Sequence, residues 1–258
     1  MKITFDSNVW RIIASPDTFP NESSIESFKQ IRKAIDENRS TPFLCETVFT
    51  LEAIKRKDRK EFFSEYKPKV NISEQDQGEG INVSFSIGPD KSAHPGNNSY
   101  LEKHLNDAIA IGFQIIKLPR IGGIVNPDIE SNFYQHNDLK AYQDMVFKVA
   151  REIESNGAGI SRIQALGKKY DSQWTRGIEK APEHENGNIA KAIAEWADGD
   201  SVACHIAVNG DYFCSRDNAH KAGDTSVFSE SNLGWLKSNY GFRLISPEDL
   251  AEKLKIST

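Results

Sequence analysis

The sequence has little of what thiolate metal sites and disulfide frameworks require. It contains three cysteines, Cys45, Cys204 and Cys214, and none of them forms a CxxC pair. An odd number of cysteines cannot pair completely within one chain, so we predict reduced, buried thiols. The six histidines are scattered, without an HExxH motif or paired Cys/His spacing, which argues against a zinc site. Any metal ion is therefore expected to bind oxygen ligands.

Long apolar runs and excess positive charge are also missing. No stretch of the 258 residues is long and apolar enough to span a bilayer, and the opening MKITFDSNVW lacks the apolar run of a signal peptide. We therefore expect a cytoplasmic protein with no membrane partner. The net charge of −5 argues against a globally basic nucleic-acid coat but allows a local basic groove.

The first 67 and the last 71 residues alternate short strands with amphipathic helices. The residues Asp198-Gly199-Asp200 separate two of the predicted helices, and Ser246-Pro247 begins another with a capping serine and an early proline. This order predicts an α/β fold built on a parallel sheet. The predicted strands are 2–6, 41–45, 211–215 and 242–245, and the predicted helices are 24–38, 46–57, 188–197 and 201–208.

The middle of the chain has a different character. Residues 81–87 alternate as a half-buried strand in a hairpin, and 88–98 form a loop rich in Pro, Gly, Asn and Ser. Helical spacing then recurs over 101–117, 139–155 and 160–170. We therefore predict an α/β core of residues 1–67 and 188–258. Residues 68–187 are predicted to be a large central α+β insertion, mostly helical with a short β element.

Three acidic residues occupy positions where a parallel sheet gathers its ligands, outside the carboxyl ends of the strands, and a fourth, Glu52, could reach the same edge. Asp6 closes the first strand, Asp217 follows the strand at 211–215, and Asp200 begins the helix that leads into that strand. Glu52 lies on the helix after the second strand. Crowded carboxylates repel one another unless a cation compensates their charge. An oxygen-only site of this kind suits Mg²⁺ or Mn²⁺.

Four segments carry a resemblance to a known family: ITFDSN, FLCETVFTLEAI, DGDSVACHIA and DYFCSRD, in this order. The chain resembles the PIN-domain (PIN-like) metal-dependent ribonucleases over residues 1–60 and 188–255. The resemblance implies a three-layer fold, a parallel sheet with flanking helices, and hydrolysis of RNA phosphodiester bonds with Mg²⁺ or Mn²⁺. It also implies a toxin, defence or RNA-processing role, with an antitoxin or regulatory protein as partner and homo-oligomers as an assembly.

The resemblance assigns roles to six residues. It implies that the catalytic and metal-binding acids are Asp6, Glu52, Asp200 and Asp217, with Asn8 and Ser215 in support. Two alternatives stay open in the sequence: Glu46 in place of Glu52, and Asp198 in place of Asp200.

Basic residues near these acids are the candidates for substrate binding. We expect Lys55, Arg56 and Arg216 to contact RNA, because cationic side chains dominate affinity for phosphates. A solvated helix face explains Lys55 and Arg56 equally well, and Glu52 has the spacing for a helical ion pair with Arg56.

Two other functions compete with the nuclease. One is a catalytically silent RNA-binding or scaffold module on the same fold, which would bind RNA without cleaving it. The other is a metal-dependent phosphatase, but Asp6-Ser7-Asn8 lacks the paired aspartates of the haloacid dehalogenase nucleophile motif.

Overall fold

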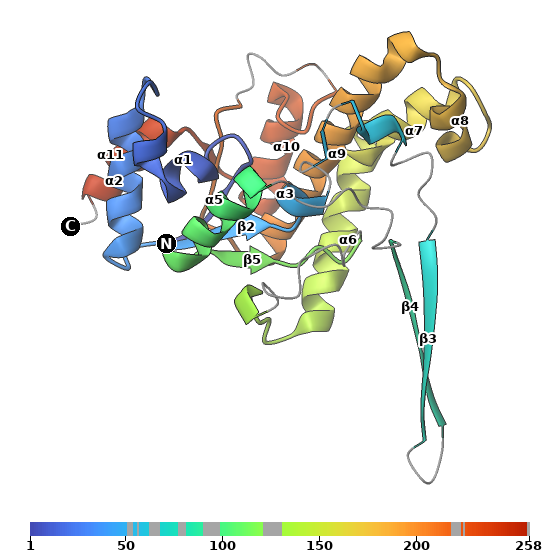
Figure 1. The fold of residues 1–258 in the computed structure, drawn as a ribbon, viewed down its shortest axis with the longest axis horizontal. Helices are drawn as coiled ribbons and strands as arrows, with labels where there is room; N and C mark the ends of the chain where they lie inside the picture. Colours follow the sequence, from blue (N-terminus) through green and yellow to red (C-terminus); the bar gives the residue numbers. More distant parts are fainter. Residues whose placement is uncertain are drawn as a thin grey trace.

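The core of the protein is a five-stranded sheet in which all neighbouring strands are parallel (Figure 1). The computed structural model describes residues 1–50, 54–55, 57–61, 68–76, 81–89, 99–120, 131–217, 223 and 225–256, with backbone alone for 49–50, 68–76, 81–89, 99–100 and 256. The strand order is β5-β2-β1-β6-β7. The strands are β1 (Lys2–Phe5), β2 (Thr41–Cys45), β5 (Gln114–Ile116), β6 (Tyr212–Cys214) and β7 (Leu244–Ile245).

Helices cover both faces of this sheet, because successive strand residues point to opposite sides and both sides are apolar. Ile3 and Phe5 contribute to the core on one face, and Phe43 and Phe213 to the core on the other. The first face is covered by α1 (Trp10–Ala14), α2 (Ile25–Asp36), α5 (Ser99–Ala110) and α11 (Pro247–Ile256). The second is covered by α6 (Leu139–Ser155), α9 (Asn186–Ala207) and α10 (Glu230–Tyr240).

Two short helices pack against the first half of α9 and form a smaller apolar cluster. They are α7 (Ile160–Lys168) and α8 (Trp174–Lys180). They approach closely through two glycines, since a Cβ atom on Gly177 would lie 1.9 Å from the carbonyl oxygen of Gly167. Further short elements in the described part of the chain include η1 (Pro16–Thr18), α3 (Thr47–Thr50) and η4 (Glu183–Glu185).

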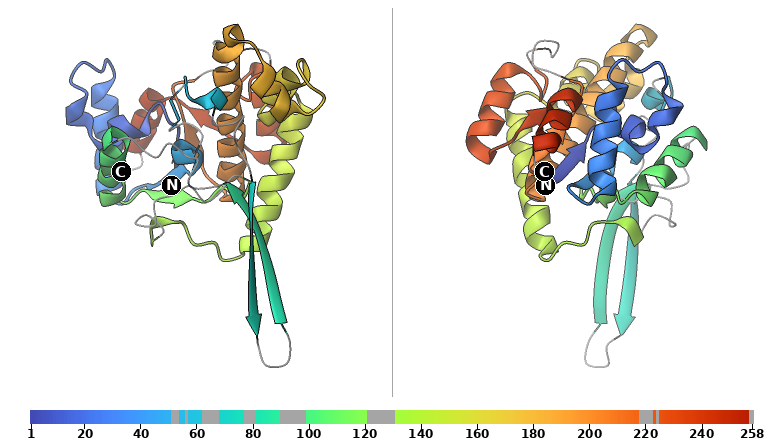
Figure 2. Two further views of the ribbon diagram at one scale, coloured as in Figure 1. Left: turned by 45° about the vertical axis from the view of Figure 1, so that its right-hand side comes forward. Right: turned by 90° about the vertical axis from the view of Figure 1, so that its left-hand side faces the viewer.

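A two-stranded hairpin extends away from the body in all three views (Figures 1 and 2). Its strands are β3 (Pro68–Asp76) and β4 (Ile81–Pro89), which pair antiparallel along their whole length. Among the described strands, neither β3 nor β4 pairs with any third strand. The alternation of residues 81–87 therefore predicted both the strand and the hairpin correctly.

The sequence correctly predicted the parallel α/β architecture and several elements, including β2, α2, α6 and the start of α11, where Asp249 N–H donates to the Ser246 hydroxyl. The single helix predicted over 101–117 is wrong. The α5 helix ends at Ala110, Gly112 adopts a φ of +97°, and 114–116 form β5. A left-handed glycine is a common helix terminator.

The predicted break at Asp198-Gly199-Asp200 is also wrong, because α9 runs without interruption from Asn186 to Ala207. Gly199 allows close packing and does not form a turn: a Cβ there would lie 3.0 Å from the Cα of Gly159.

The division into a core and an insertion stays a prediction. The structure adds that β5, from within 68–187, is the edge strand of the same sheet.

The strand order places a topological switch point between β1 and β6. From β1 the chain crosses to β2 on one side, while β6 lies on the other side of β1. The connections leaving the carboxyl ends of these two strands therefore diverge, and ligands of open α/β sheets bind in the crevice at such a point.

Candidate functional site

Asp6 and Ser215 lie directly after the two strands that flank the switch point. Asp6 follows β1, and its backbone N–H donates to the carbonyl of Cys214 at the end of β6 (2.9 Å). Asp6 is 5% exposed and Ser215 is 1% exposed. The last bond of the β1–β6 ladder thus fixes a carboxylate and a hydroxyl next to each other at the carboxyl edge of the sheet.

Hydrogen bonds connect these two residues to Asn8 and Asp217. The Ser215 hydroxyl donates to Asp6 Oδ2 (2.5 Å) and accepts from the backbone N–H of Asp217 (2.9 Å). The Asn8 amide nitrogen lies 3.3 Å from Ser215 Oγ and 3.2 Å from Asp217 Oδ2. The structure therefore brings together four of the residues that the sequence singled out, Asp6, Asn8, Ser215 and Asp217, and we call them the switch-point cluster.

The electrostatics of the switch-point cluster disfavour two bare negative charges. The pKa of Asp6 is raised from 3.8 to about 6, because burial and the nearby charge of Asp217 raise it more than the hydrogen bonds from Ser215 and Ser7 lower it. The Ser7 backbone N–H donates to Asp6 Oδ1 at 2.6 Å. A positive ion at Asp6 and Asp217 would relieve this repulsion.

Asp200 lies in the interior of α9, not at a helix start, so its predicted role as a helix cap is wrong. His205, also on α9, shows how this helix lies along the strands, because His205 Nδ1 lies 2.8 Å from Thr4 Oγ1 of β1. Asp200 comes five residues earlier, about 7.5 Å along the helix, toward the carboxyl edge of the sheet. Asp200 is thus at the level of Asp6.

The carboxylate of Asp200 pairs with an arginine. Arg120 Nη1 lies 2.9 Å from Asp200 Oδ1, and Arg120 Nη2 pairs with Glu154. Burial raises the pKa of Asp200 to about 6, while the charge of Arg120 lowers it. In the part of the chain that the structure describes, no three His, Cys, Asp or Glu side chains come close enough to hold one metal ion.

Glu46, the alternative second acid, is fully buried at the end of β2. Its Oε2 accepts a hydrogen bond from the backbone N–H of Leu118 (2.8 Å), and its own N–H donates to Ile116 O (3.0 Å). These two bonds tie the end of β2 to the segment after β5. Glu46 therefore has a structural function that accounts for its burial.

Four other predicted residues give less information. Glu52 and Arg56 lie outside the described residues, so their place relative to the cluster stays a prediction. Lys55 is exposed, and Asp198, the alternative third acid, is half-buried on α9.

Arg216, a predicted RNA contact, is held by groups of the protein itself. Its guanidinium pairs with Glu22 (2.6 Å) and lies over the ring of Phe28, 5.0 Å from the ring centre. Its backbone N–H donates to Asn8 Oδ1 (3.1 Å). The backbone of Arg216 therefore helps to orient Asn8, while its side chain is engaged away from the cluster.

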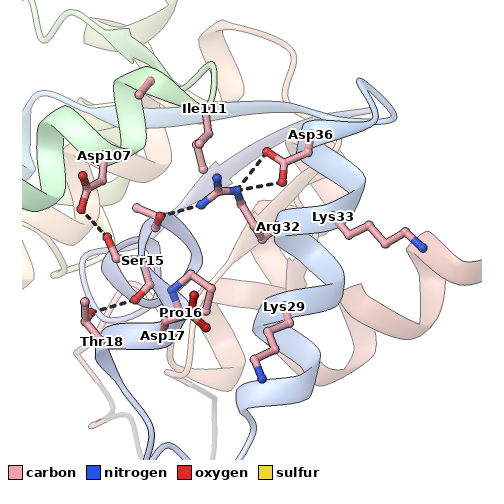
Figure 3. A pocket seen from close by; sticks show the side chains of 12 residues that line it. Ser15, Pro16, Asp17, Thr18, Lys29, Arg32, Lys33, Asp36, Asp107 and Ile111 are labelled. Atoms are coloured by element: carbon pink, nitrogen blue, oxygen red, sulfur yellow. Dashed lines mark hydrogen bonds and ion pairs between the residues drawn. The ribbon is translucent and has the colours of Figure 1, made fainter.

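A surface pocket of about 610 Å³ lies apart from the cluster, between α1, α2 and α5 (Figure 3). Its central cation, Arg32, donates to both oxygens of Asp36 and to the carbonyl of Ala14. Across the pocket, the Ser15 hydroxyl donates to Asp107 (2.6 Å). None of the predicted site residues lines this pocket. The hydrogen bonds from Arg32 to Ala14 and from Ser15 to Asp107 connect the three helices to one another.

Sequence reasoning missed Arg120 and Glu154. Glu154 belongs to a helix that was predicted well, but nothing in its local pattern marks it. Arg120 had a partial signal that was misread: Gly112 marks a helix end, which excludes residues 113–117 from the helix, but the strand at 114–116 that precedes Arg120 depends on pairing with β2.

No helix among the described residues has the length and apolar character needed to cross a membrane. Comparisons of the chain with protein-family models, with curated proteins and with solved structures found no match.

Proposed function

We propose that this protein is a PIN-like, divalent-metal-dependent nuclease that hydrolyses RNA phosphodiester bonds. The observation that carries the proposal is the switch-point cluster: two carboxylates, a hydroxyl and an amide joined by hydrogen bonds at the carboxyl ends of β1 and β6. Open parallel sheets bind their ligands at this place. The choice of RNA as substrate rests on the family resemblance of the sequence.

The residues of the cluster fit Mg²⁺ or Mn²⁺. Asp6 and Asp217 offer carboxylate oxygens, which these ions prefer. A bound cation would also reduce the repulsion between the two carboxylates. Asp6 and Asp217 would hold the ion, with Asp200 and Glu52 as the further acids that the resemblance assigns. Such an ion makes bound water a stronger nucleophile and stabilises the charge of the attacked phosphodiester.

The protein's own groups prepare the carboxylates for this task. The Ser215 hydroxyl and the Ser7 N–H hold the two oxygens of Asp6 in one orientation. The Asn8 amide donates to Asp217 and keeps it on the same side. Because Asp6 and Ser215 are buried, the hydrogen bond between them acts in a medium of low dielectric constant, where a fixed dipole stabilises charge more strongly than a water-exposed one.

The test is cleavage of labelled single-stranded and structured RNA with Mg²⁺, Mn²⁺ or EDTA. We expect metal-dependent cleavage that Asp6→Asn and Asp217→Asn reduce by at least ~100-fold. The matched control is Asp211→Asn. Asp211 lies at the amino end of β6, whereas Asp217 comes after its carboxyl end, and Asp211 accepts a hydrogen bond from Lys2 N–H (2.8 Å). Equal loss of activity in Asp211→Asn would contradict a role specific to the carboxyl edge.

A binding module without turnover is the second candidate, and one observation favours it. Among the described residues, the acids that meet number fewer than three, so the described part alone makes a sparse metal site. This alternative predicts that RNA binding, measured by filter retention or anisotropy, persists in EDTA and in Asp6→Asn, with no cleavage under any metal. A defence or toxin role, an antitoxin partner and homo-oligomers rest on the resemblance alone.

A further inference from the structure

Arg120, Asp200 and Glu154 form an ion triad in which Asp200 is buried and its two partners are partly buried. The side chain of Asp200 is 2% exposed, that of Arg120 16% and that of Glu154 25%. The three residues come from separate elements: the segment after β5, the middle of α9 and the last turn of α6. Tertiary structure alone therefore assembles this triad.

One atom of the triad lacks a full hydrogen bond. Within the described residues, Asp200 Oδ2 is buried and has no donor at full hydrogen-bond distance and angle, whereas Oδ1 accepts from Arg120. The Trp196 side chain, one turn earlier on α9, interacts with Asp200 more loosely and lowers the pKa of its carboxyl. An unsatisfied buried carboxylate oxygen is costly, so native proteins rarely keep one unless a ligand or a function accounts for it. The half-satisfied state of Asp200 is what a carboxylate would show if its full set of partners included an ion.

Arg120 carries the positive charge that makes the burial of Asp200 tolerable. Arginine stays protonated at any pH at which the protein is folded, so it leaves Asp200 by moving, not by losing a proton. A divalent cation concentrates twice the charge in a smaller volume and competes for the same oxygens. Arg120 is also more exposed than Asp200, which gives its guanidinium a solvated side to move toward.

We propose that Arg120 is an exchangeable internal counter-ion: it neutralises Asp200 when no metal is bound and is displaced when a divalent cation engages that carboxylate. This inference rests on the proposed function, since it requires the divalent cation that the proposed nuclease uses. It makes Arg120 a residue that sets the affinity for metal, because every binding event must break the Arg120–Asp200 pair.

The experiment measures Mn²⁺ binding in the absence of RNA, by the electron paramagnetic resonance signal of free Mn²⁺ at pH 7.5. We expect Arg120→Gln to bind Mn²⁺ ~10-fold more tightly than wild type, because a competing positive charge has gone. The double variant Arg120→Gln/Asp200→Asn should lose this gain. Mn²⁺ should also raise the melting temperature of Arg120→Gln more than that of wild type.

The matched control is Arg162→Gln, which breaks another arginine pair on α9, that of Arg162 Nη1 with the buried Glu195 (3.6 Å). Its Mn²⁺ affinity should equal that of wild type. If Arg120→Gln does not fold, Arg120→Lys replaces it: lysine keeps the charge but loses the forked contact to both acids, and it should bind Mn²⁺ more tightly than wild type by a smaller factor.

The counter-ion role would be overturned if Arg120→Gln bound Mn²⁺ no more tightly than wild type does. The same criterion applies to Arg120→Lys where that variant replaces Arg120→Gln. This result together with RNA cleavage that Asp6→Asn abolishes would leave the nuclease proposal standing. A ~10-fold gain in affinity with no RNA cleavage by wild type would support the counter-ion role and remove the nuclease.

Discussion

Acid should destabilise this protein through His205, which is buried in its neutral form. The ring is 1% exposed, its Nδ1 lies 2.8 Å from Thr4 Oγ1, and it packs edge-on against Phe213 and Phe242. Burial lowers the pKa of His205 from 6.5 to about 3, against a small opposite effect of the charge on Asp211. Folding therefore excludes the proton that the unfolded chain binds.

The size of the effect follows from this difference in pKa. For a histidine with a lowered pKa, stability is fully present above the unfolded pKa of 6.5 and is lost as the pH falls toward the folded pKa of about 3. At pH 5 the unfolded chain is protonated at this residue and the folded protein is not. The difference of about 1.5 pH units corresponds to about 2 kcal/mol of stability relative to pH 8.

Urea unfolding followed by tryptophan fluorescence, at pH 8 and at pH 5, measures this contribution in wild type and His205→Asn. Asparagine places an amide near the position of Nδ1 and does not titrate. The smaller side chain should cost stability at pH 8 through a cavity, and the gap to wild type should narrow by about 2 kcal/mol at pH 5. The control is His184→Asn, since His184 is exposed. A gap between wild type and His205→Asn that is the same at both pH values would refute the reasoning.

Three further predictions concern glycine packing, a buried acid and a helix cap. Gly177→Ala should cost about 2–4 kcal/mol in thermal unfolding because its Cβ would lie 1.9 Å from Gly167 O, whereas Gly187→Ala, with no atom within 4 Å, should stabilise α9 by up to ~1 kcal/mol. Asp6→Asn should raise the metal-free melting temperature more at pH 8 than at pH 4.5, because the cost of burying Asp6 grows as the pH rises from 3.8, its unfolded pKa, to about 6, its folded pKa, and is complete above that. Asp138→Ala should cost about 1 kcal/mol in urea unfolding, because Asp138 caps α6.

Each of these has an outcome that contradicts it. Equal effects of the two alanine substitutions would mean that α7 and α8 are not in close contact. A melting temperature of Asp6→Asn below that of wild type at pH 8 would mean that the hydrogen bonds to Asp6 outweigh the cost of burying its charge. Unchanged stability of Asp138→Ala would place the start of α6 elsewhere.

Elements whose own sequence decides their structure were predictable. The α6 helix was predicted with its observed bounds, because its apolar residues recur at helical spacing and Asp138 caps it. The β5 strand was not, because Gln114–Ile116 has only three residues and follows a helix without a polar break. Its strand structure comes from pairing with β2, which local sequence does not reveal.

The candidate site, too, was predictable only where local sequence and strand order place its residues. Asp6, Asn8, Ser215 and Asp217 belong to two short motifs that end adjacent parallel strands, so the topology brings them together. Asp200 was identified, but its partner was not: the Arg120–Asp200 pair joins residues 80 positions apart. Ion pairs of this kind depend on how helices pack on the sheet, and their residue types are common everywhere in the chain.

The β3–β4 hairpin begins and ends at one place, because Pro68 and Pro89 are cross-strand partners. Antiparallel partners have Cα atoms about 5 Å apart, so this hairpin, which we call the arm, leaves and rejoins the rest of the chain at almost the same point. Adding or removing residues in matched pairs would change how far the arm reaches without moving either attachment point. A short turn between residues 68 and 89 could replace it, which makes the arm a segment whose length can vary independently of the sheet and of the site that the sheet positions.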